Sequence, residues 1–546
     1  MLLKTTARFL LSLATMAVAC GTSAQQAAPP APPSRDFVIS GTLVDSLSSQ
    51  PIAHARVAIA PVTKRNDFTT VITGEDGVFS FTNLTPGKYA LTAQARGYLL
   101  QSFNQHDQFA SSIVVGPDSD SRQLLFRLPP TCAIAGIVTD EAGEPVRDAQ
   151  VSLYFTGLSA GTDVTQSRGG TTTDDQGAFH FGHLAPGHYL VAVSARPWYA
   201  QRPLDLPATV PGDPAVRSYV ESLTISQSAL DVAYPVTFYG GATDPAAATT
   251  LTLGPGDRVT ANITLQPVRA LRVHLSKDVQ GTRAFLQGSI LGGLSLPVMT
   301  ETHFSGSGEQ EIVGIPPGRY TLTTNEVGPV STREIEINAS GEIDQNQGIV
   351  YVPVSAKLQF DPGTKPSQPY VQLLNKKTRV VSSERVGDEG EAVFKQGVPP
   401  GTYEVSINNA PGFYLKNIFA VGARVTGRTI EVRSGATVKL AISAARGQGE
   451  IAGIASHDGK PSAGAMIVLV PADPAHNQVL FRRDQSDSDG SFTLPQVVPG
   501  AYTLLALEHG WDLAWTDPEV LKNYLGRGVA VRVQPNGKYE VKVDVQ

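Results

Sequence analysis

A serine motif in this sequence has the spacing of a hydrolase nucleophile. Residues 157–161 read GLSAG and match the G-x-S-x-G pattern, in which Ser159 would attack an acyl group. That pattern requires a strand before the serine and a helix after it. The segment that follows Gly161 is instead polar and glycine-rich, which is typical of a hairpin loop. We therefore interpret the match as coincidental and expect no catalytic residue here.

Three histidines could in principle bind a metal ion. His180, His183 and His188 lie within one short segment, but no carboxylate or cysteine completes a defined zinc geometry. His180 alternates with phenylalanines, so it should face solvent on a strand. The sequence contains no His-Glu-x-x-His or His-x-x-Glu motif. We expect solvated histidines rather than a zinc site.

A group of aspartates has a superficial likeness to a calcium loop. Asp484, Asp487 and Asp489 precede Gly490, but a loop of the EF-hand type would need glutamate where Gln496 stands. A hairpin turn explains the aspartates more simply. We expect neither a metal ion nor a cofactor.

Aromatic side chains could stack on sugar rings. The candidates are Trp198 with Tyr199, Tyr234 with Phe238 and Tyr239, and Trp511 with Trp515. Packing at domain contacts or edges is the simpler interpretation of such residues. Glycan stacking, above all by Trp198, Tyr199, Trp511 and Trp515, remains the alternative.

The first residues have the pattern of an export signal. A basic start precedes an apolar stretch at 9–19, which is too short to span a membrane, and small residues suit cleavage after Ala24. The four residues that end at Cys20 also resemble a bacterial lipobox, so lipidation of Cys20 is the alternative. Residues 25–35 form a Pro/Ala linker. We expect an exported protein, in the periplasm, at the outer membrane or outside the cell, without a transmembrane span after cleavage.

The composition is that of a globular, turn-rich protein. Of 546 residues, 41% are hydrophobic, and 43 basic against 49 acidic side chains leave a net charge of −6, which argues against a nucleic-acid surface. The 52 glycines and 39 prolines punctuate short apolar runs and favour an all-β fold. Besides Cys20 there is only Cys132, which we expect to be a buried, inert thiol.

The chain consists of repeats. Residues 76–89 (DGVFSFTNLTPGKY), 176–189 (QGAFHFGHLAPGHY) and 489–502 (DGSFTLPQVVPGAY) share a turn glycine, a Pro-Gly pair and a tyrosine at constant spacing. Weaker copies end at Tyr320 and Tyr403. The pattern predicts a turn, an alternating strand, a Pro-Gly corner and a second strand that begins with a buried tyrosine. Each unit should contain about seven short strands, as in a small β-sandwich.

These residues resemble the carboxypeptidase regulatory-like domain, whose pattern is G-x-V-x-D…P-x-x-x-A-x-V…T-D-x-x-G-x-F-x-F…L-x-P-G-x-Y. The first unit matches at Gly41, Asp45, Pro51, Ala55, Val57, Gly77, Phe79, Phe81, Pro86, Gly87 and Tyr89. The second unit matches at Gly136, Asp140, Pro145, Ala149, Val151, Asp174, Gly177, Phe179, Phe181, Pro186, Gly187 and Tyr189. The last unit matches well, and the third and fourth lack the front half. The stretch 230–265 also resembles exported multi-unit relatives from acidobacteria.

The resemblance implies transthyretin-like, seven-stranded sandwiches, and related folds include starch-binding-like modules. We predict these segments: signal peptide 1–24, linker 25–35, and sandwiches at 36–129, 130–268 (with an insertion), 269–353, 354–446 and 447–546. One short helix should begin after Asp517, which is a good N-cap before Pro518, and end at Gly526 near Trp511 and Trp515.

The sequence therefore predicts an all-β, tandem array of about five sandwiches that is exported and non-catalytic. Its expected role is that of a cell-envelope scaffold that presents loops and sheet edges to an envelope protein or a polysaccharide. A carbohydrate-binding protein that uses the surface aromatics is the alternative, and a hydrolase is a distant third.

Overall fold

The computed structural model describes residues 37–546 except for 118, 120, 160, 201–229, 276–282, 290–294, 305–309, 326–329, 344–350, 362–365 and 378–380. The predicted signal peptide, the linker and Cys20 lie outside the described residues. Five pairs of β-sheets follow one another along the chain, and each pair encloses a hydrophobic core of its own. The fold is therefore all-β, a tandem array of β-sandwiches, as predicted.

The strands of the first three domains have the following bounds. The first domain contains β1 (Phe37–Asp45), β2 (Arg56–Pro61), β3 (Thr69–Ile72), β4 (Val78–Leu84), β5 (Gly87–Gln94), β6 (Gln101–Ser102), β7 (Ile113–Val115) and β8 (Leu124–Leu128). The second contains β9 (Cys132–Thr139), β10 (Gln150–Ser159), β11 (Thr162–Thr172), β12 (Ala178–Leu184), β13 (Gly187–Ser194), β14 (Val232–Ala233), β15 (Thr237–Phe238), β16 (Leu251–Leu253), β17 (Arg258–Thr260), β18 (Ile263–Thr264) and β19 (Val268–Arg269). The third contains β20 (Leu271–Leu275), β21 (Arg283–Ser289), β22 (Ser295–Pro297), β23 (Glu301–Phe304), β24 (Gln310–Ile315), β25 (Gly318–Asn325), β26 (Val330–Ile337) and β27 (Gly341–Ile343).

The last two domains complete the array. The fourth contains β28 (Val352–Asp361), β29 (Tyr370–Asn375), β30 (Val381–Arg385), β31 (Glu391–Val398), β32 (Gly401–Asn408), β33 (Phe413–Val421), β34 (Arg424–Thr426), β35 (Thr429–Val432) and β36 (Val438–Arg446). The fifth contains β37 (Gly449–His457), β38 (Lys460–Pro461), β39 (Met466–Pro471), β40 (Arg482–Gln485), β41 (Ser491–Val497), β42 (Gly500–Leu507), helix α2 (Pro518–Leu525), β43 (Val529–Val533) and β44 (Lys538–Asp544). The predicted boundary at 353/354 lies near the start of β28.

All five domains share one strand order. The first strand of each domain lies between an antiparallel partner and a parallel one: β1 between β4 and β8, β9 between β12 and β17, β20 between β24 and β27, β28 between β31 and β36, and β37 between β41 and β44. In the second sheet of each domain, β2, β10, β21, β29 and β39 occupy the equivalent central position. The third and fourth domains thus keep the strand order although their sequence pattern is weak.

A close approach of strands explains one glycine of the repeat. A Cβ added at Gly41 or Gly453 would lie 2.2 or 2.0 Å from a carbonyl oxygen of the parallel partner strand, and a Cβ at Gly136 would lie 2.2 Å from the Ala261 carbonyl oxygen, between β17 and β18. The same Cβ would meet a buried phenylalanine ring, at 2.8 Å from Phe79 in the first domain. Only glycine allows these strands and this ring to pack as they do.

The tyrosine at each Pro-Gly corner makes the same hydrogen bond. Every one of the five rings is buried, and its hydroxyl donates to the carbonyl four residues earlier. The oxygen–oxygen distances are 3.0 Å for Tyr89, 2.8 Å for Tyr189 and 2.7 Å for Tyr403 and Tyr502, and Tyr320 makes the equivalent bond to Pro316. The same tyrosine-to-backbone hydrogen bond therefore stabilises the Pro-Gly corner in every domain.

Helix α2 has the ends that the sequence predicts. The Asp517 carboxylate accepts a hydrogen bond from the Glu519 amide at 2.9 Å, and Gly526 is the C-cap. Leu521 is fully buried and packs in a cluster that contains Trp515, with Trp511 at its margin. Among the described residues, no helix is long and apolar enough to cross a membrane.

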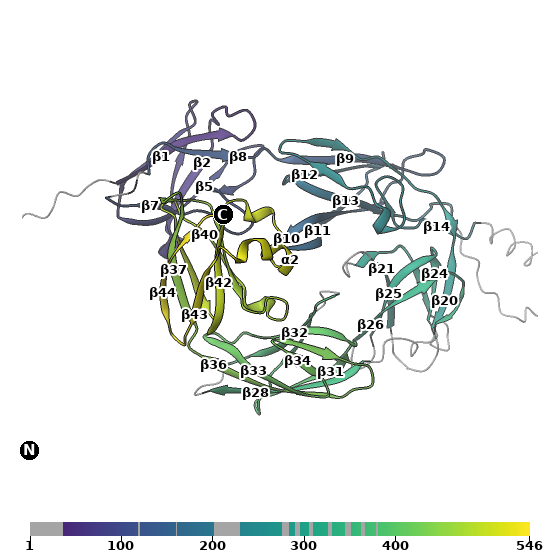
Figure 1. Cartoon of the computed structure of the whole chain (residues 1–546). Helices are drawn as coiled ribbons and strands as arrows, with labels where there is room; N and C mark the ends of the chain where they lie inside the picture. The colour runs from purple at the N-terminus through teal and green to yellow at the C-terminus, as the bar shows by residue number, and fades with distance from the viewer. Residues whose placement is uncertain are drawn as a thin grey trace, which may run out of the picture.

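The five domains follow one another around a ring, so that the fifth, in yellow, lies beside the first, in purple (Figure 1). Between the second and third domains, Leu296 packs with Phe238 and Leu190. Between the fourth and fifth, the Arg428 amide donates to the His476 carbonyl at 3.0 Å. The ring closes where the fifth domain contacts the first and second.

Candidate functional site

The serine motif lies at the tip of a hairpin. Ser159 is the last residue of β10, and β11 begins at Thr162, so a strand rather than a helix follows the serine. The Thr516 hydroxyl of the fifth domain donates to the Gly161 carbonyl at 2.6 Å and lies 3.1 Å from the Thr162 hydroxyl. The tip therefore forms a contact between domains and lacks the strand–helix turn of a hydrolase nucleophile.

The three histidines lie on exposed positions of the second domain. His180 is on β12, His183 follows it at a positive φ of 57°, and His188 on β13 lies 2.9 Å from the Thr252 hydroxyl. In the part of the chain that the structure describes, no three His, Cys, Asp or Glu side chains gather in a way that could hold a metal ion. Cys132 is buried, and its thiol points at the Gly254 carbonyl at 3.0 Å.

Two of the three aspartates of the fifth domain accept hydrogen bonds within that domain, and the third contacts the first domain. Asp489 accepts from the Ser491 amide at 3.0 Å, and Asp484 accepts from the Thr493 amide at 2.8 Å, with burial raising the pKa of Asp484. Asp487 instead faces the first domain: one oxygen accepts from the Ser112 amide at 2.7 Å, and the other is 2.6 Å from the Lys88 ammonium. The sequence predicts the turn, whereas the role of Asp487 between domains has no local signal.

Backbone groups extend this contact along β7. The Ser488 amide donates to the Ser112 carbonyl at 3.0 Å, and the Val114 amide donates to the Ser488 hydroxyl at 2.8 Å. The Ser111 hydroxyl donates to the Ser486 carbonyl at 2.8 Å. The loop between β40 and β41 thereby satisfies polar groups on the open edge of β7, which would otherwise need water.

An aromatic cluster with an arginine completes the contact. The Trp511 ring stacks on His106 of the first domain, with centroids 5.0 Å apart and planes 5° apart. The Arg483 guanidinium lies 4.8 Å from the Trp515 ring centroid and 3.2 Å from the Asp107 carboxylate. Burial lowers the pKa of Arg483, and Asp107 opposes that shift. We call the contacts of Lys88, 104–114, 483–491 and Trp511 the closing contact.

The predicted stacking residues thus have different surroundings. Trp515 is only 6% exposed, and Trp511 is half-buried against the first domain, which fits the interpretation as packing residues. Trp198 is 87% exposed, and its ring meets Tyr199 edge-on at 5.8 Å. Glycan stacking stays a prediction, and Trp198 is the tryptophan whose ring is open to it.

The Glu141 carboxylate accepts hydrogen bonds from two tyrosines, one of which is the neighbour of Trp198. The Tyr199 hydroxyl donates to Glu141, and the Tyr234 hydroxyl donates to its other oxygen at 2.8 Å. Burial and the Glu141 carboxylate raise the pKa of Tyr199 to about 12 and raise that of Tyr234 further. Burial disfavours the Glu141 carboxylate, but the tyrosine hydrogen bonds outweigh it and lower the pKa of Glu141. These bonds orient Tyr199 and, through it, Trp198.

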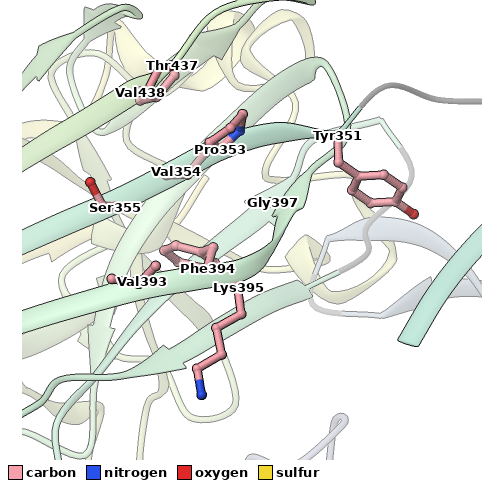
Figure 2. A pocket seen from close by; sticks show the side chains of 10 residues that line it. All are labelled: Tyr351, Pro353, Val354, Ser355, Val393, Phe394, Lys395, Gly397, Thr437 and Val438. Atoms are coloured by element: carbon pink, nitrogen blue, oxygen red, sulfur yellow. The ribbon is translucent and has the colours of Figure 1, made fainter. Parts of the chain in front are cut away.

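Two cavities lie apart from the closing contact. Figure 2 shows one of about 290 Å³ in the fourth domain, lined by side chains of β28, β31 and β36, with Tyr351 projecting just before β28. A larger one of about 780 Å³ lies between the second and third domains, against Phe238, Leu296 and Tyr320.

The family model of the carboxypeptidase regulatory-like domain matches residues 38–128 and 133–217. The two matches fall on the first and second domains, where the residue pattern predicts this resemblance. No curated protein matches the chain.

Several solved structures are similar to parts of the chain. The Bacillus anthracis TIE protein is 11% identical over 95% of this chain and 76% of its own, with a TM-score of 0.17. A streptococcal ancillary pilin is 12% identical over 57% and 98%, with a TM-score of 0.18, and the minor pilin of Streptococcus agalactiae is 11% identical over 42% and 96%, with a TM-score of 0.20. At these TM-scores the likenesses carry nothing about function, and the fold rests on the strand order described above.

Proposed function

We propose that this chain is an exported, non-catalytic scaffold of the cell envelope that holds a protein or polysaccharide partner. The observation that carries the proposal is the closed array of five sandwiches. The charged and aromatic side chains that cluster in the fifth domain make contacts between domains, and we interpret them as structural rather than catalytic. The export pattern of the first residues supports a location outside the cytoplasm.

The partner class can be tested with the full mature chain immobilised on a support. Envelope extract is passed over it, and bound material is treated either with protease or with periodate before elution. A saturable component that one treatment removes, and that the heat-unfolded chain does not retain, would support a scaffold and identify the partner as protein or glycan. Equal retention by the unfolded chain would refute specific binding.

Export and processing need a separate measurement. Fractionation of cells that express the full chain should place it outside the cytoplasm, and accumulation in the cytoplasm would contradict the proposal. A C20A variant distinguishes the two processing routes. Unchanged mobility and unchanged sensitivity to globomycin indicate cleavage after Ala24, whereas a change in either indicates lipidation.

A carbohydrate-binding function is the second candidate, and Trp198 is the observation in its favour. Its exposed ring is supported by Tyr199, which Glu141 holds in place. Such a platform suits stacking on a sugar face. On a glycan array, W198A should abolish binding, whereas F419A, which removes an aromatic ring that is 69% exposed in the fourth domain, should leave it unchanged.

The hydrolase alternative is tested by turnover. We expect no hydrolysis of ester or peptide substrates by the purified chain, because the hairpin tip holds Ser159 without the following helix. Hydrolysis that disappears in S159A would overturn the non-catalytic assignment.

A further inference from the structure

The closing contact joins two faces that are far apart in the chain and complementary in chemistry. The pair Ser111–Ser486, for example, is separated by 375 residues. The face on the first domain presents the Lys88 ammonium and the edge of β7, and the face on the fifth presents the Asp487 carboxylate. Every molecule therefore carries one copy of each face.

The two faces can separate without damage to either sandwich. The cores of the first and fifth domains are separate clusters that share no residue. Trp515 packs in a cluster of the fifth domain and also lies against Gly161 of the second domain, so separation of the fifth domain from both neighbours uncovers part of its ring. Most of the bonds across the contact join polar groups that water can solvate, and the Lys88 side chain is already 38% exposed.

Separated faces nevertheless remain open to a partner. The edge of β7 has backbone groups that can form hydrogen bonds with another segment. In the closed ring, groups of the fifth domain form these hydrogen bonds. The only surface guaranteed to match a free face is the opposite face, either of the same molecule or of a second copy. When two molecules exchange their fifth domains, two identical contacts close in a symmetric dimer.

We propose that the closing contact is exchangeable and that its partner outside the ring is a second copy of this chain. The contact within one molecule benefits from a high effective concentration, so the closed ring is the form at low protein concentration. Exchange between copies forms the same bonds and becomes favourable as the concentration of the chain approaches that effective concentration. Two charge pairs, Lys88–Asp487 and Arg483–Asp107, join the faces, and reversal of the first pair changes which faces match while the second stays intact.

Charge reversal of this pair tests the proposal in the full chain. In K88E two carboxylates face each other within a molecule, and in D487K two ammonium groups do. In a mixture of the two, the first domain of D487K meets the fifth domain of K88E as a native pair, and the remaining two faces meet as a reversed pair. The double variant K88E/D487K carries the reversed pair within one chain and is the matched control.

Sedimentation velocity is measured for each variant alone, for the double variant and for the equimolar mixture. We expect dimers of double mass in the mixture, and monomers for each single variant and for the double variant at the same total concentration. A mixture that stays monomeric overturns the proposal. Dimers of either single variant alone, in the same amount as in the mixture, also overturn it, because association would then use another surface.

Discussion

Replacement of Gly453 by alanine should destabilise the fifth domain through backbone contact rather than side-chain packing. A Cβ at this position would lie 2.0 Å from the Val541 carbonyl oxygen and 2.7 Å from the Phe492 ring. The oxygen belongs to the backbone of β44, so no side-chain rotation relieves the contact. Strands β37 and β44 would have to separate by roughly 1 Å, which takes nearby hydrogen bonds beyond their normal length.

The size of the effect follows from the number of bonds lost. About three interstrand hydrogen bonds at about 1 kcal/mol each give a loss of about 3 kcal/mol in the free energy of unfolding. Such a loss should speed amide exchange through opening of the domain about 100-fold. It should lower the melting transition of the fifth domain by roughly 12 to 24 °C.

The measurement is hydrogen exchange of peptides from β37 and β44, together with scanning calorimetry. The matched control is G526A: Gly526 lies in the same domain, has a right-handed helical φ of −65°, and a Cβ there would meet nothing within 4 Å. The reasoning would be refuted if G453A exchanged as slowly as G526A, because the strand approach would then be relieved without cost.

Three further outcomes can be measured on the same protein. Y403F removes the corner hydroxyl and should lower the free energy of unfolding of the fourth domain by about 1 kcal/mol in urea, whereas no change would show that the corner bond adds nothing. Burial raises the pKa of Tyr502 to about 12, whereas the tyrosine of the unfolded chain ionises near its ordinary value. The free energy of unfolding of the fifth domain should therefore fall by about 2 to 3 kcal/mol as pH rises from about 10 to 12. The Y502F variant should not show this fall. D487A should speed exchange of the Ser112 amide roughly 10- to 100-fold by opening the contact between the domains, and D489A, which loses only bonds within its own turn, should not.

The local features of the repeat could be predicted from the sequence because each depends on residues close together in the chain. The Pro-Gly corner, the buried tyrosine and the caps of α2 are set by neighbours within a few positions, and the structure confirms them. The turn explanation for the aspartates also holds for Asp489.

The contacts between domains could not be predicted in the same way. His106, Arg483 and Asp487 look like ordinary loop residues, and their partners lie hundreds of positions away. For Trp511 and Trp515, the sequence left both glycan stacking and packing between domains open. The sequence around an aromatic residue does not show whether its ring faces solvent or another domain. The 353/354 boundary stays a prediction, because the fourth domain lacks the front-half pattern that marks a first strand in the sequence.

The first strand of four domains pairs in parallel with the last, and β9 of the second domain pairs in parallel with β17 and β18, which has a mechanical consequence. Because both strands run in the same direction, the chain enters a sandwich at one end and leaves it at the other. A pull along the chain therefore slides β28 against β36, and the eight residue pairs from Val354–Val438 to Asp361–Ala445 resist it together. An antiparallel pair at this position would bring both chain ends to the same side and would open one bond at a time. Each sandwich is thus built to carry tension from one neighbour to the next, in shear rather than by unzipping.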